Sequence, residues 1–536
     1  MTAQGDRVLE LGVRQVYGGP VFIDVVQVSK EPPAPGPAGL VLVPVNTHDR
    51  GYRTTYRLYI REEDQGRPLL LGTVKIGSTE QQPGGRALRA GRYSSLNANG
   101  RRLWFSLGQD DEYYVSIAAL GNEIRIFILT ALGDIAYDPD TFAVAMEHAV
   151  TEASLLRTVT SVTVEQQFRR IARGGARLGR GYDYQYVGPR SADGHSRTAL
   201  DFVVDPLSIP PSNIHVLIGR NGVGKTTLLR EIARAAVRVD QADDGSGFWP
   251  RGAAPLGVPM LANVVSISFS AFDPFANFVD QRPDGLVSFE YVGLHIRAGA
   301  HDERKSHTDL AAEFSGSLAA IHSSGRTQRW ARAVSGLMTD PAFAASSVPS
   351  LVDEMAGTGP DTFNDEGPQR VFAELSSGHA SVMLILTRLV ELVAEQTLVL
   401  FDEPESHLHP PLLSAFIRTL SQLLADRNGV AIIATHSPVV LQEVPRSCVW
   451  KLIRHGRRLR AERPSIETFG ENVGVLTHEV FGLEVRQSGF LATLQAAVDQ
   501  LDTYEQVLQH FGGQLGSEAK GIVRILLADK SEGEDS

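Results

Sequence analysis

One short segment constrains the fold more than any other part of this chain. Residues 219–226 read GRNGVGKT, a complete G-x4-G-K-T pattern, with the apolar residues Val216–Ile218 before it and an amphipathic helix pattern after it. A strand, a glycine-rich loop and a helix in this order let backbone N–H groups surround phosphate oxygens, and the helix N-terminus adds partial positive charge. The sequence therefore predicts an α/β domain that binds a nucleoside triphosphate.

Each residue of this loop has an expected role in binding ATP. Lys225 is expected to reach the β- and γ-phosphates, and the hydroxyl of Thr226 is expected to ligate Mg²⁺. The complete set of predicted nucleotide-binding residues in the loop is Gly219, Arg220, Asn221, Gly222, Val223, Gly224, Lys225, Thr226 and Thr227.

A second segment, FDEPESHLHP at residues 401–410, combines carboxylates and histidines. The apolar run before it is typical of a buried parallel strand, which would place Asp402 and Glu403 at the strand tip. Asp402 is then expected to hold Mg²⁺ and Glu403 to act as the general base for the attacking water. A transition-metal site built on His407 and His409 is the alternative, but it needs further ligands that are not evident nearby in the sequence.

Two more motifs point to a family. ELSSGHA lies at residues 374–380, and AIIATHSP lies at residues 431–438. With GRNGVGKTT and FDEPESHLHP they resemble the RecF/OLD-like branch of the ABC-type, bacterial AAA-type ATPases. The resemblance covers roughly residues 180–485, and no nuclease domain of the Toprim type is visible after it.

This resemblance implies an ATP site shared between two chains. Ser376 and Gly378 would contact the γ-phosphate of an ATP held by a second subunit, and His436 would sense that phosphate as a switch histidine. Residues 405–409 would lie on a loop that faces the partner head. The implied ligands are ATP and Mg²⁺, and the implied assembly is a homodimer or a higher homo-oligomer.

The sequence departs from the family pattern in three places. His379 stands in the signature where many relatives carry glutamine. No glutamine follows the second core strand, where only Ser268, Ser270 or Asp273 could substitute weakly. The residue that stacks on adenine is also unassigned. The candidates are Tyr182, Tyr184 and Tyr186, whose pattern is more typical of ordinary tyrosines in a strand.

Periodicity predicts four regions along the chain. Residues 1–110 are β-rich, with TYRLYI at residues 55–60 showing the alternation of a half-buried strand, and residues 111–172 are helical. Together they predict an α+β domain before the ATPase head at residues 173–485. Residues 281–374 are expected to form a helical insertion or lid in the head. Residues 486–536 are expected to form C-terminal helices and an acidic tail.

Three charged clusters have a structural and a functional interpretation. Residues 110–112, Asp-Asp-Glu, suit the first turn of a helix better than a metal site. The arginines of residues 169–181 suit a solvated linker better than a contact with a phosphate backbone. The arginines at 457, 458 and 460 suit an exposed hairpin edge better than a DNA contact.

Composition narrows the functional class. The 536 residues carry a net charge of −11, which disfavours a mainly electrostatic nucleic-acid binder, although a DNA contact stays open. The single cysteine, Cys448, excludes an internal disulfide and a cysteine-rich zinc site. No apolar run reaches the length of a membrane span and no signal peptide is evident, so a cytoplasmic protein without membrane partners is expected.

The leading hypothesis is therefore an ATP-hydrolysing switch. In the resembling branch, such ATPases control a separately encoded effector, for example a nuclease, in phage defence or DNA maintenance. The alternatives are a DNA-repair clamp that binds DNA directly, the ATPase subunit of an ABC transporter, and a nucleotide-gated binding module with little turnover.

Overall fold

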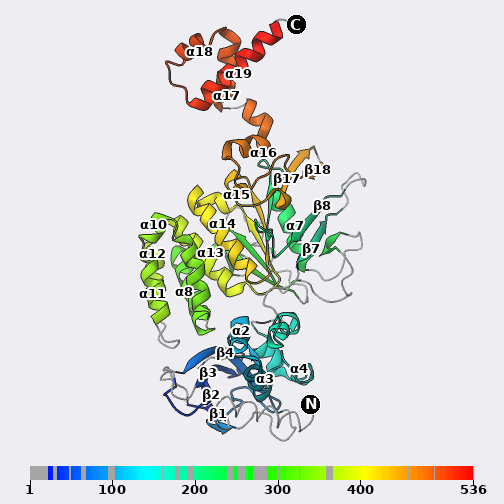
Figure 1. The fold of residues 1–536 in the computed structure, drawn as a ribbon, viewed down its shortest axis with the longest axis vertical. Coiled ribbons are helices and arrows are strands. Elements are labelled where there is room, and N and C mark those ends of the chain that lie inside the picture. Colours follow the sequence, from blue (N-terminus) through cyan, green and yellow to red (C-terminus); the bar gives the residue numbers. More distant parts are fainter. Residues whose placement is uncertain are drawn as a thin grey trace.

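The protein was analysed as a computed structural model. It describes residues 22–27, 33–46, 50–61, 68–93, 103–157, 159, 161–175, 181–189, 197–237, 246–251, 261, 263–269, 287–298, 301–324, 326–357, 366–456, 458–487 and 489–534. These residues form an N-terminal domain, a central head and a C-terminal group of helices, which follow one another along the long axis of the molecule (Figure 1).

A six-stranded sheet forms the base of the N-terminal domain, in the order β5-β1-β2-β3-β4-β6. β1 and β2 are parallel to each other, and all other neighbouring strands in this sheet are antiparallel. The strands are β1 (Phe22–Val25), β2 (Gly39–Pro44), β3 (Thr55–Arg61), β4 (Leu69–Ser78), β5 (Gly91–Tyr93) and β6 (Trp104–Gly108).

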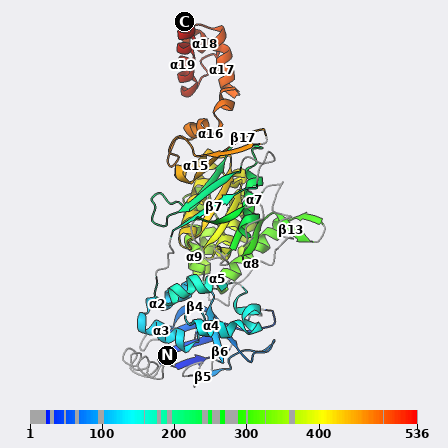
Figure 2. The same ribbon diagram turned by 90° about the vertical axis from the view of Figure 1, so that its right-hand side faces the viewer.

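Helical segments cover this sheet (Figure 2). They are α2 (Asp111–Ala119), α3 (Asn122–Ala131), α4 (Pro139–Met146), η2 (Thr151–Leu155), α5 (Ser161–Thr163), η3 (Val164–Phe168) and α6 (Arg169–Ala172). The expectation of a half-buried β3 is wrong, because both of its faces are covered. Tyr56 and Leu58 are fully buried on one face, and Arg57 and Tyr59 are only 2% and 3% exposed on the other.

A seven-stranded sheet in the order β12-β11-β15-β16-β9-β17-β18 forms the centre of the head. All neighbours are parallel except the hairpin of β17 and β18. The strands are β9 (Ile214–Ile218), β11 (Asn263–Ser268), β12 (Ser288–Gly293), β15 (Thr397–Asp402), β16 (Val430–Thr435), β17 (Val449–His455) and β18 (Arg458–Glu462). The predicted α/β class with a mixed, mainly parallel sheet is thereby confirmed.

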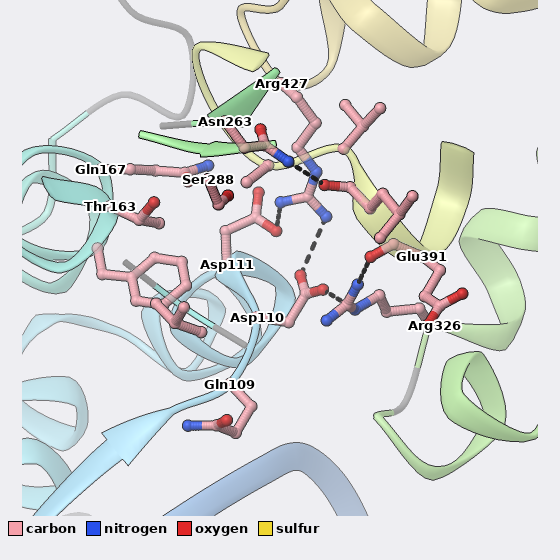
Figure 3. A pocket seen from close by; sticks show the side chains of 15 residues that line it. Gln109, Asp110, Asp111, Thr163, Gln167, Asn263, Ser288, Arg326, Glu391 and Arg427 are labelled. Atoms are coloured by element: carbon pink, nitrogen blue, oxygen red, sulfur yellow. Dashed lines mark hydrogen bonds and ion pairs between the residues drawn. The ribbon is translucent and has the colours of Figure 1, made fainter. Parts of the chain in front are cut away.

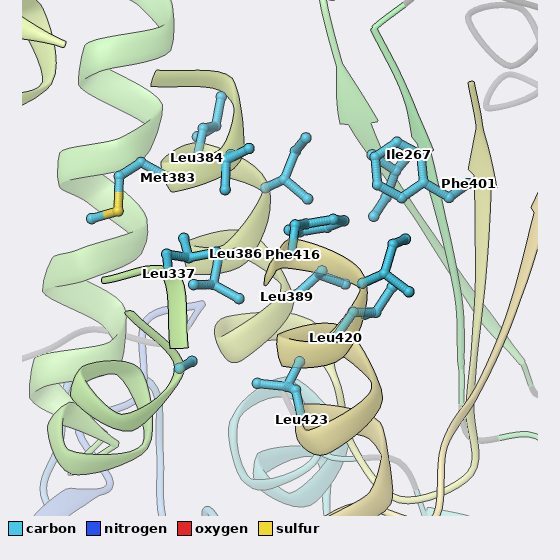
Figure 4. Packing of buried hydrophobic residues seen from close by; sticks show 14 of the residues in the cluster. Ile267, Leu337, Met383, Leu384, Leu386, Leu389, Phe401, Phe416, Leu420 and Leu423 are labelled. Atoms are coloured by element: carbon cyan, nitrogen blue, oxygen red, sulfur yellow. The ribbon is translucent and has the colours of Figure 1, made fainter. Parts of the chain in front are cut away.

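Two layers enclose this sheet. Helix α7 (Lys225–Val237) packs on one face, beside a small antiparallel sheet of β7 (Tyr182–Val187), β8 (Ala199–Val204) and β10 (Gly247–Pro250). Helices α13 (Ser377–Leu392), α14 (Pro410–Ala425) and α15 (Pro438–Gln442) cover the other face. In Figure 4, Leu389 of α13 and Phe416 of α14 interdigitate between the helices and Phe401 of the sheet. Burial of these side chains from both layers is the main source of stability for the head.

The predicted helical insertion at residues 281–374 needs one correction. It begins with β12, a strand of the central sheet, and with a protruding hairpin of β13 (His295–Ala298) and β14 (His301–Arg304) (Figure 2). Five helices follow and pack against α13 and α14: α8 (His307–Ser323), α9 (Thr327–Leu337), α10 (Pro341–Ala344), α11 (Val348–Gly357) and α12 (Glu366–Glu374). The strand was missed because Ser288 and Glu290 share a face with Val292, so the strand lacks the continuous apolar run of a buried parallel strand.

The chain closes with α16 (Val473–Gln487) and a separate helical group of α17 (Gly489–Gln500), α18 (Tyr504–His510) and α19 (Ser517–Glu534). This group has its own small apolar core around Leu494, Val498 and Val523. Among the described helices, not one combines the length and the apolar character that crossing a bilayer would require.

Candidate functional site

Three of the four motifs singled out in the sequence meet at one edge of the central sheet. Strands β15, β16 and β9 are adjacent and parallel, with Asp402 opposite Ala434 and Thr435 opposite Ile218. The glycine-rich loop, the Asp402–Glu403 pair and His436 therefore follow three neighbouring strands at their carboxyl ends. Open parallel sheets bind ligands in this position, because the loops there diverge and leave polar groups accessible.

The glycine-rich loop depends on its glycines for its shape. Gly222 and Gly224 have φ angles of 77° and 103°, which side chains rarely permit. Gly219 lies so close to the adjoining strand that a Cβ atom there would come within 2.6 Å of the carbonyl oxygen of Leu452. The loop is consequently held open by backbone geometry.

Lys225 and an arginine that the sequence reasoning missed bring positive charge to this loop. Lys225 Nζ donates hydrogen bonds to the carbonyl oxygens of Gly219 and Arg220, at 2.9 and 3.2 Å. Burial lowers its pKa, against the opposing charges of the nearby carboxylates. Arg454, from β17, donates from Nε to the carbonyl of Val223 at 2.8 Å. No local pattern marks Arg454, because it reaches the loop from 231 residues away.

The other predicted residues of the loop have different exposures. The side chains of Arg220, Asn221 and Thr227 are exposed, and Val223 is 5% exposed. Arg220 Nη2 donates to the carbonyl oxygen of Phe481 at 3.4 Å. This contact brings α16 close to the loop. The exposed members thus remain accessible to a nucleotide.

Asp402 and Thr226 are in direct contact. The hydroxyl of Thr226 lies 3.0 and 2.9 Å from the two carboxylate oxygens of Asp402, which is only 3% exposed. One hydroxyl and one buried carboxylate give an all-oxygen donor set of the kind that Mg²⁺ prefers. The two residues predicted to hold this ion are therefore placed side by side and suit it chemically.

Glu403 has an unusual backbone conformation. Its φ and ψ angles are 49° and 62°, in the left-handed region, and its N–H donates to the carbonyl oxygen of Ala434 at 2.8 Å. A side chain other than glycine adopts this region at a cost of about 1–2 kcal/mol. The strain turns the side chain of Glu403 out of the strand direction, where it is 31% exposed and its Oε1 lies 3.9 Å from Nδ1 of His436. Strained residues of this kind are concentrated at functional sites.

Glu405 positions His436. Its Oε1 accepts hydrogen bonds from the backbone N–H of His436 and the hydroxyl of Thr435, both at 2.7 Å, and lies 3.0 Å from the ring Nδ1. The carboxylate of Glu405, which accepts from the ring, raises the pKa of His436, against a smaller effect of burial. The side chain of Glu405 is 9% exposed and points into its own head, where it supports His436 from within the loop that is expected to face a partner chain.

The signature residues begin a helix. Ser376 is the N-cap of α13, and its hydroxyl oxygen accepts from the backbone N–H of His379 at 3.4 Å. Ser376 is exposed and Gly378 is half-buried, so the N-terminus of this helix is accessible from outside the chain. A free helix N-terminus is a favourable place for a phosphate.

The unassigned positions are resolved in part. Tyr184 stacks on Phe248 with ring centroids 5.1 Å apart, and Tyr186 donates to Glu231 at 3.0 Å, so both act as buried strand tyrosines. Ser268 is fully buried at the end of β11, opposite Asp402. Ser270, Asp273, the side chain of Tyr182, the side chain of His407 and Arg457 lie outside the described residues.

A cluster of ion pairs joins the N-terminal domain to the head (Figure 3). Asp110 caps α2 by accepting from Glu112 N–H at 3.0 Å, and its carboxylate pairs with Arg326 and Arg427. Asp111 pairs with the same Arg427, which is 3% exposed. Burial opposes the ionisation of Asp110, but the neighbouring arginines hold its pKa well below the usual value. The predicted cap is present, while its partners across the interface were not predictable locally.

The arginines between the two domains also contact protein groups. Arg170 forms a bidentate pair with Glu395 at 2.7 and 2.9 Å, and Arg173 donates to the carbonyl of Tyr137 at 3.3 Å. Arg169 donates from Nε to the carbonyl of Ala136 at 3.2 Å, and the arginines at 177 and 180 lie outside the described residues. The described part of this segment is thus a tether between the domains, and the solvated-linker interpretation does not hold for it.

Comparisons with known proteins were consistent with this site. A family profile described as "AAA domain, putative AbiEii toxin, Type IV TA system" matches residues 270–442. Protein ea59 of Escherichia phage lambda is 38% identical over 509 residues, which is 91% of this chain and 94% of that protein. The profile match and the strand-end geometry support a nucleotide-binding P-loop ATPase domain.

Solved structures were matched as well. An ATP-binding cassette of an ABC transporter in its ADP conformation has a TM-score of 0.27 and 11% identity, covering 58% of this chain and 98% of that chain. UvrA2 from Deinococcus radiodurans has a TM-score of 0.26 and 13% identity, covering 51% of this chain and 36% of that chain.

Proposed function

This chain belongs to the family of protein ea59 of Escherichia phage lambda, and we propose that it is an ATP-hydrolysing switch of the RecF/OLD-like type. The observation that carries the proposal is the meeting of Thr226, Asp402, Glu403 and His436 at one sheet edge. These are the groups that phosphoryl transfer to water needs: an ion-binding pair, a base and a group that senses the phosphate.

The residues divide the chemistry among them. Thr226 and Asp402 would hold Mg²⁺, which neutralises the charge that develops on the phosphate oxygens. Glu403, turned out of the strand by its left-handed backbone, accepts the proton of the attacking water. His436, held in place by Glu405, contacts the γ-phosphate and registers its loss. Lys225 leaves the loop carbonyls that it now contacts and binds the phosphates.

ATP is held between two heads in this proposal. The P-loop covers one side of the triphosphate, and the exposed N-terminus of α13 with Ser376 offers a second phosphate-binding surface. One chain would present this surface to the ATP of another. ATP then holds the two heads together, and its hydrolysis releases them.

The output is transmitted to the N-terminal domain through α14. This helix begins beside the Asp402–Glu403 segment at His409, and the chain reaches Arg427 two residues after the helix ends. Its 16 residues span about 24 Å at 1.5 Å per residue. Arg427 contacts Asp110 and Asp111, so a shift at the nucleotide reaches the N-terminal domain. A separately encoded effector, for example a nuclease in phage defence or DNA maintenance, would bind there.

The test uses Glu403→Gln in the full-length protein. The variant is expected to bind ATP and Mg²⁺ with unchanged affinity, to lose phosphate release by a factor of about 100 or more, and to accumulate as an ATP-dependent dimer or larger assembly. Phosphate release and light scattering after size-exclusion chromatography measure the two effects. Glu505→Gln, on α18 and remote from the sheet edge, is the matched control and should behave as the unmodified protein.

Two outcomes would contradict the proposal in different ways. Undiminished phosphate release by Glu403→Gln would remove Glu403 from the mechanism. A variant that binds ATP but stays monomeric at high concentration would reject the shared site and leave the hydrolytic assignment intact.

A further inference from the structure

Three ligand-type side chains converge outside the nucleotide site. They are Asp340, His379 and His409, and their donor atoms all lie within 4.8 Å of one another. Nε2 of His379 lies 3.5 Å from Asp340 Oδ1, and Nε2 of His409 lies 3.2 Å from Asp340 Oδ2. The sequence had paired His409 with His407 only and offered no further ligand. The fold supplies Asp340 and His379 from the helical insertion and the signature helix.

His379 presents a buried nitrogen without a hydrogen bond. Its Nδ1 lies 2.9 Å from the hydroxyl of Ser376, and its Nε2 has no hydrogen-bond partner among the described residues. When Nδ1–H donates to Ser376, Nε2 carries a lone pair that faces the carboxylate of Asp340. Two electron-rich groups facing each other at 3.5 Å are unfavourable unless a proton on Nε2 or a metal cation lies between them.

The carboxylate of Asp340 is buried and held in place. It is only 4% exposed, and its Oδ1 accepts from the backbone N–H of Phe343 at 2.8 Å. The carboxylate therefore has a fixed position between the two imidazoles.

We propose that Asp340, His379 and His409 bind a divalent transition-metal ion, with Zn²⁺ as the best fit. Two imidazoles and one carboxylate select such an ion over Mg²⁺, which prefers oxygen ligands alone. Ligands at about 2.0–2.1 Å in a tetrahedral arrangement lie about 3.3 Å from each other. Nε2 of His379 and Nε2 of His409 approach different oxygens of Asp340, at 3.5 and 3.2 Å, so the carboxylate would contribute both oxygens or turn to bring one oxygen near both nitrogens.

The surroundings also fit a metal site. With Nδ1–H donating to Ser376, that hydroxyl would be the outer partner that fixes the tautomer of His379, as such partners do for histidine ligands in general. His409 is 50% exposed, which provides a path of entry and leaves room for water as a fourth ligand.

Binding has a modest cost at His409. Its Nδ1 accepts a hydrogen bond from the backbone N–H of Leu412 as the N-cap of α14. Metal coordination through Nε2 moves the ring proton to Nδ1 and breaks this bond. At 3.4 Å the bond is already long, so the loss is small compared with a new metal ligand.

The ion would tie α10, α13 and α14 together at their N-terminal ends. It would also fix the position of Ser376 through His379. If ATP is shared between two heads as proposed above, metal binding would then favour the ATP-dependent assembly. Metal binding itself is measured without ATP, so the two ideas can fail separately.

The experiment uses the full-length protein after dialysis against a chelator. Titration with Zn²⁺ by calorimetry, and with Co²⁺ by its visible absorption, is expected to show one ion per chain with the spectrum of a four-coordinate nitrogen–oxygen site. Asp340→Asn, His379→Gln and His409→Asn should each weaken binding by about tenfold or more. Asparagine can still cap a helix, so the substitutions at 340 and 409 preserve the local fold.

A histidine elsewhere is the control. His478→Gln, at an exposed position on α16, should bind Zn²⁺ as the unmodified protein does. Folding of each variant is followed by circular dichroism. The proposal is overturned if the unmodified protein binds no ion, or if the folded His409→Asn variant keeps the affinity and the Co²⁺ spectrum.

Discussion

Glu405 holds His436 through both its backbone and its ring. One carboxylate oxygen accepts the N–H of His436 at 2.7 Å and lies 3.0 Å from its Nδ1. The histidine at the end of β16 is therefore fixed in orientation before any nucleotide arrives. The carboxylate that fixes it comes from the segment that directly follows Glu403.

The pairing of Glu405 with His436 predicts a pH dependence. The pKa of His436 is raised above its ordinary value of 6.5 by the Glu405 hydrogen bond. Its contribution to stability is then fully present below pH 6.5 and is lost as the pH rises through the raised pKa. A double-mutant cycle of Glu405→Gln and His436→Gln, measured by urea unfolding, should give its largest coupling near about pH 5–6 and a smaller one above about pH 8. A coupling that grows with pH would contradict this assignment.

The buried arginine between the two domains should be costly to remove. Arg427→Met removes this arginine from the buried carboxylates of Asp110 and Asp111 and leaves Asp110 with Arg326, which should destabilise the protein by about 3–5 kcal/mol in urea unfolding. Arg332→Met is the matched control, because Arg332 is 62% exposed and pairs with Glu112 across the same interface at 3.5 Å. It should cost less than about 1 kcal/mol. Equal costs for the two variants would mean that the buried pairs are not the main contact.

The contact between Thr226 and Asp402 predicts how Mg²⁺ acts. Thr226→Val removes the hydroxyl and preserves the shape of the side chain, so ATP binding should lose about 10- to 100-fold of its Mg²⁺-dependent affinity. Binding in the presence of a chelator should change little. Thr226→Ser keeps the hydroxyl and should retain the effect of Mg²⁺. Fluorescent-nucleotide titrations with and without Mg²⁺ distinguish these cases.

A glycine in α9 predicts a packing effect. A Cβ at Gly336 would overlap the hydroxyl of Thr419 on α14, so Gly336→Ala should destabilise the head by about 1–3 kcal/mol. Adding Thr419→Ala should recover part of this loss. Gly316→Ala on α8 is the control, because a Cβ there meets nothing within 4 Å and should stabilise the helix by up to about 1 kcal/mol. Thermal unfolding followed by circular dichroism measures all three.

The parts of the site that were predictable from the sequence are those encoded locally. A glycine-rich loop between a strand and a helix, or two acids after an apolar run, has its geometry determined by neighbouring residues. Thr226 and Asp402 could be paired because Asp402 ends β15 and Thr226 follows the loop after β9, and the carboxyl ends of parallel strands meet at one sheet edge. The shared role in binding Mg²⁺ therefore predicted this contact, although the two residues are 176 positions apart.

The rest depends on which surfaces pack together, and no local pattern reports that. Asp110 reads as a helix cap and is one, yet its pairing with Arg427 follows only from the docking of two domains. Asp340 is the N-cap of α10, and only the packing of the insertion against α14 brings it to His409. Residues that lie on both sides of an interface become visible only when the interface is known.

Helix α14 has a length that is constrained from both ends. His409 at its start belongs to the cluster with Asp340, and Arg427 just beyond its end belongs to the interface with Asp110. One residue inserted into the helix would rotate one end against the other by about 100° and lengthen it by about 1.5 Å. Either contact could then be kept, but not both. Both the length of the helix and the relative rotation of its two ends are therefore fixed, so substitutions along it should be tolerated far better than insertions or deletions.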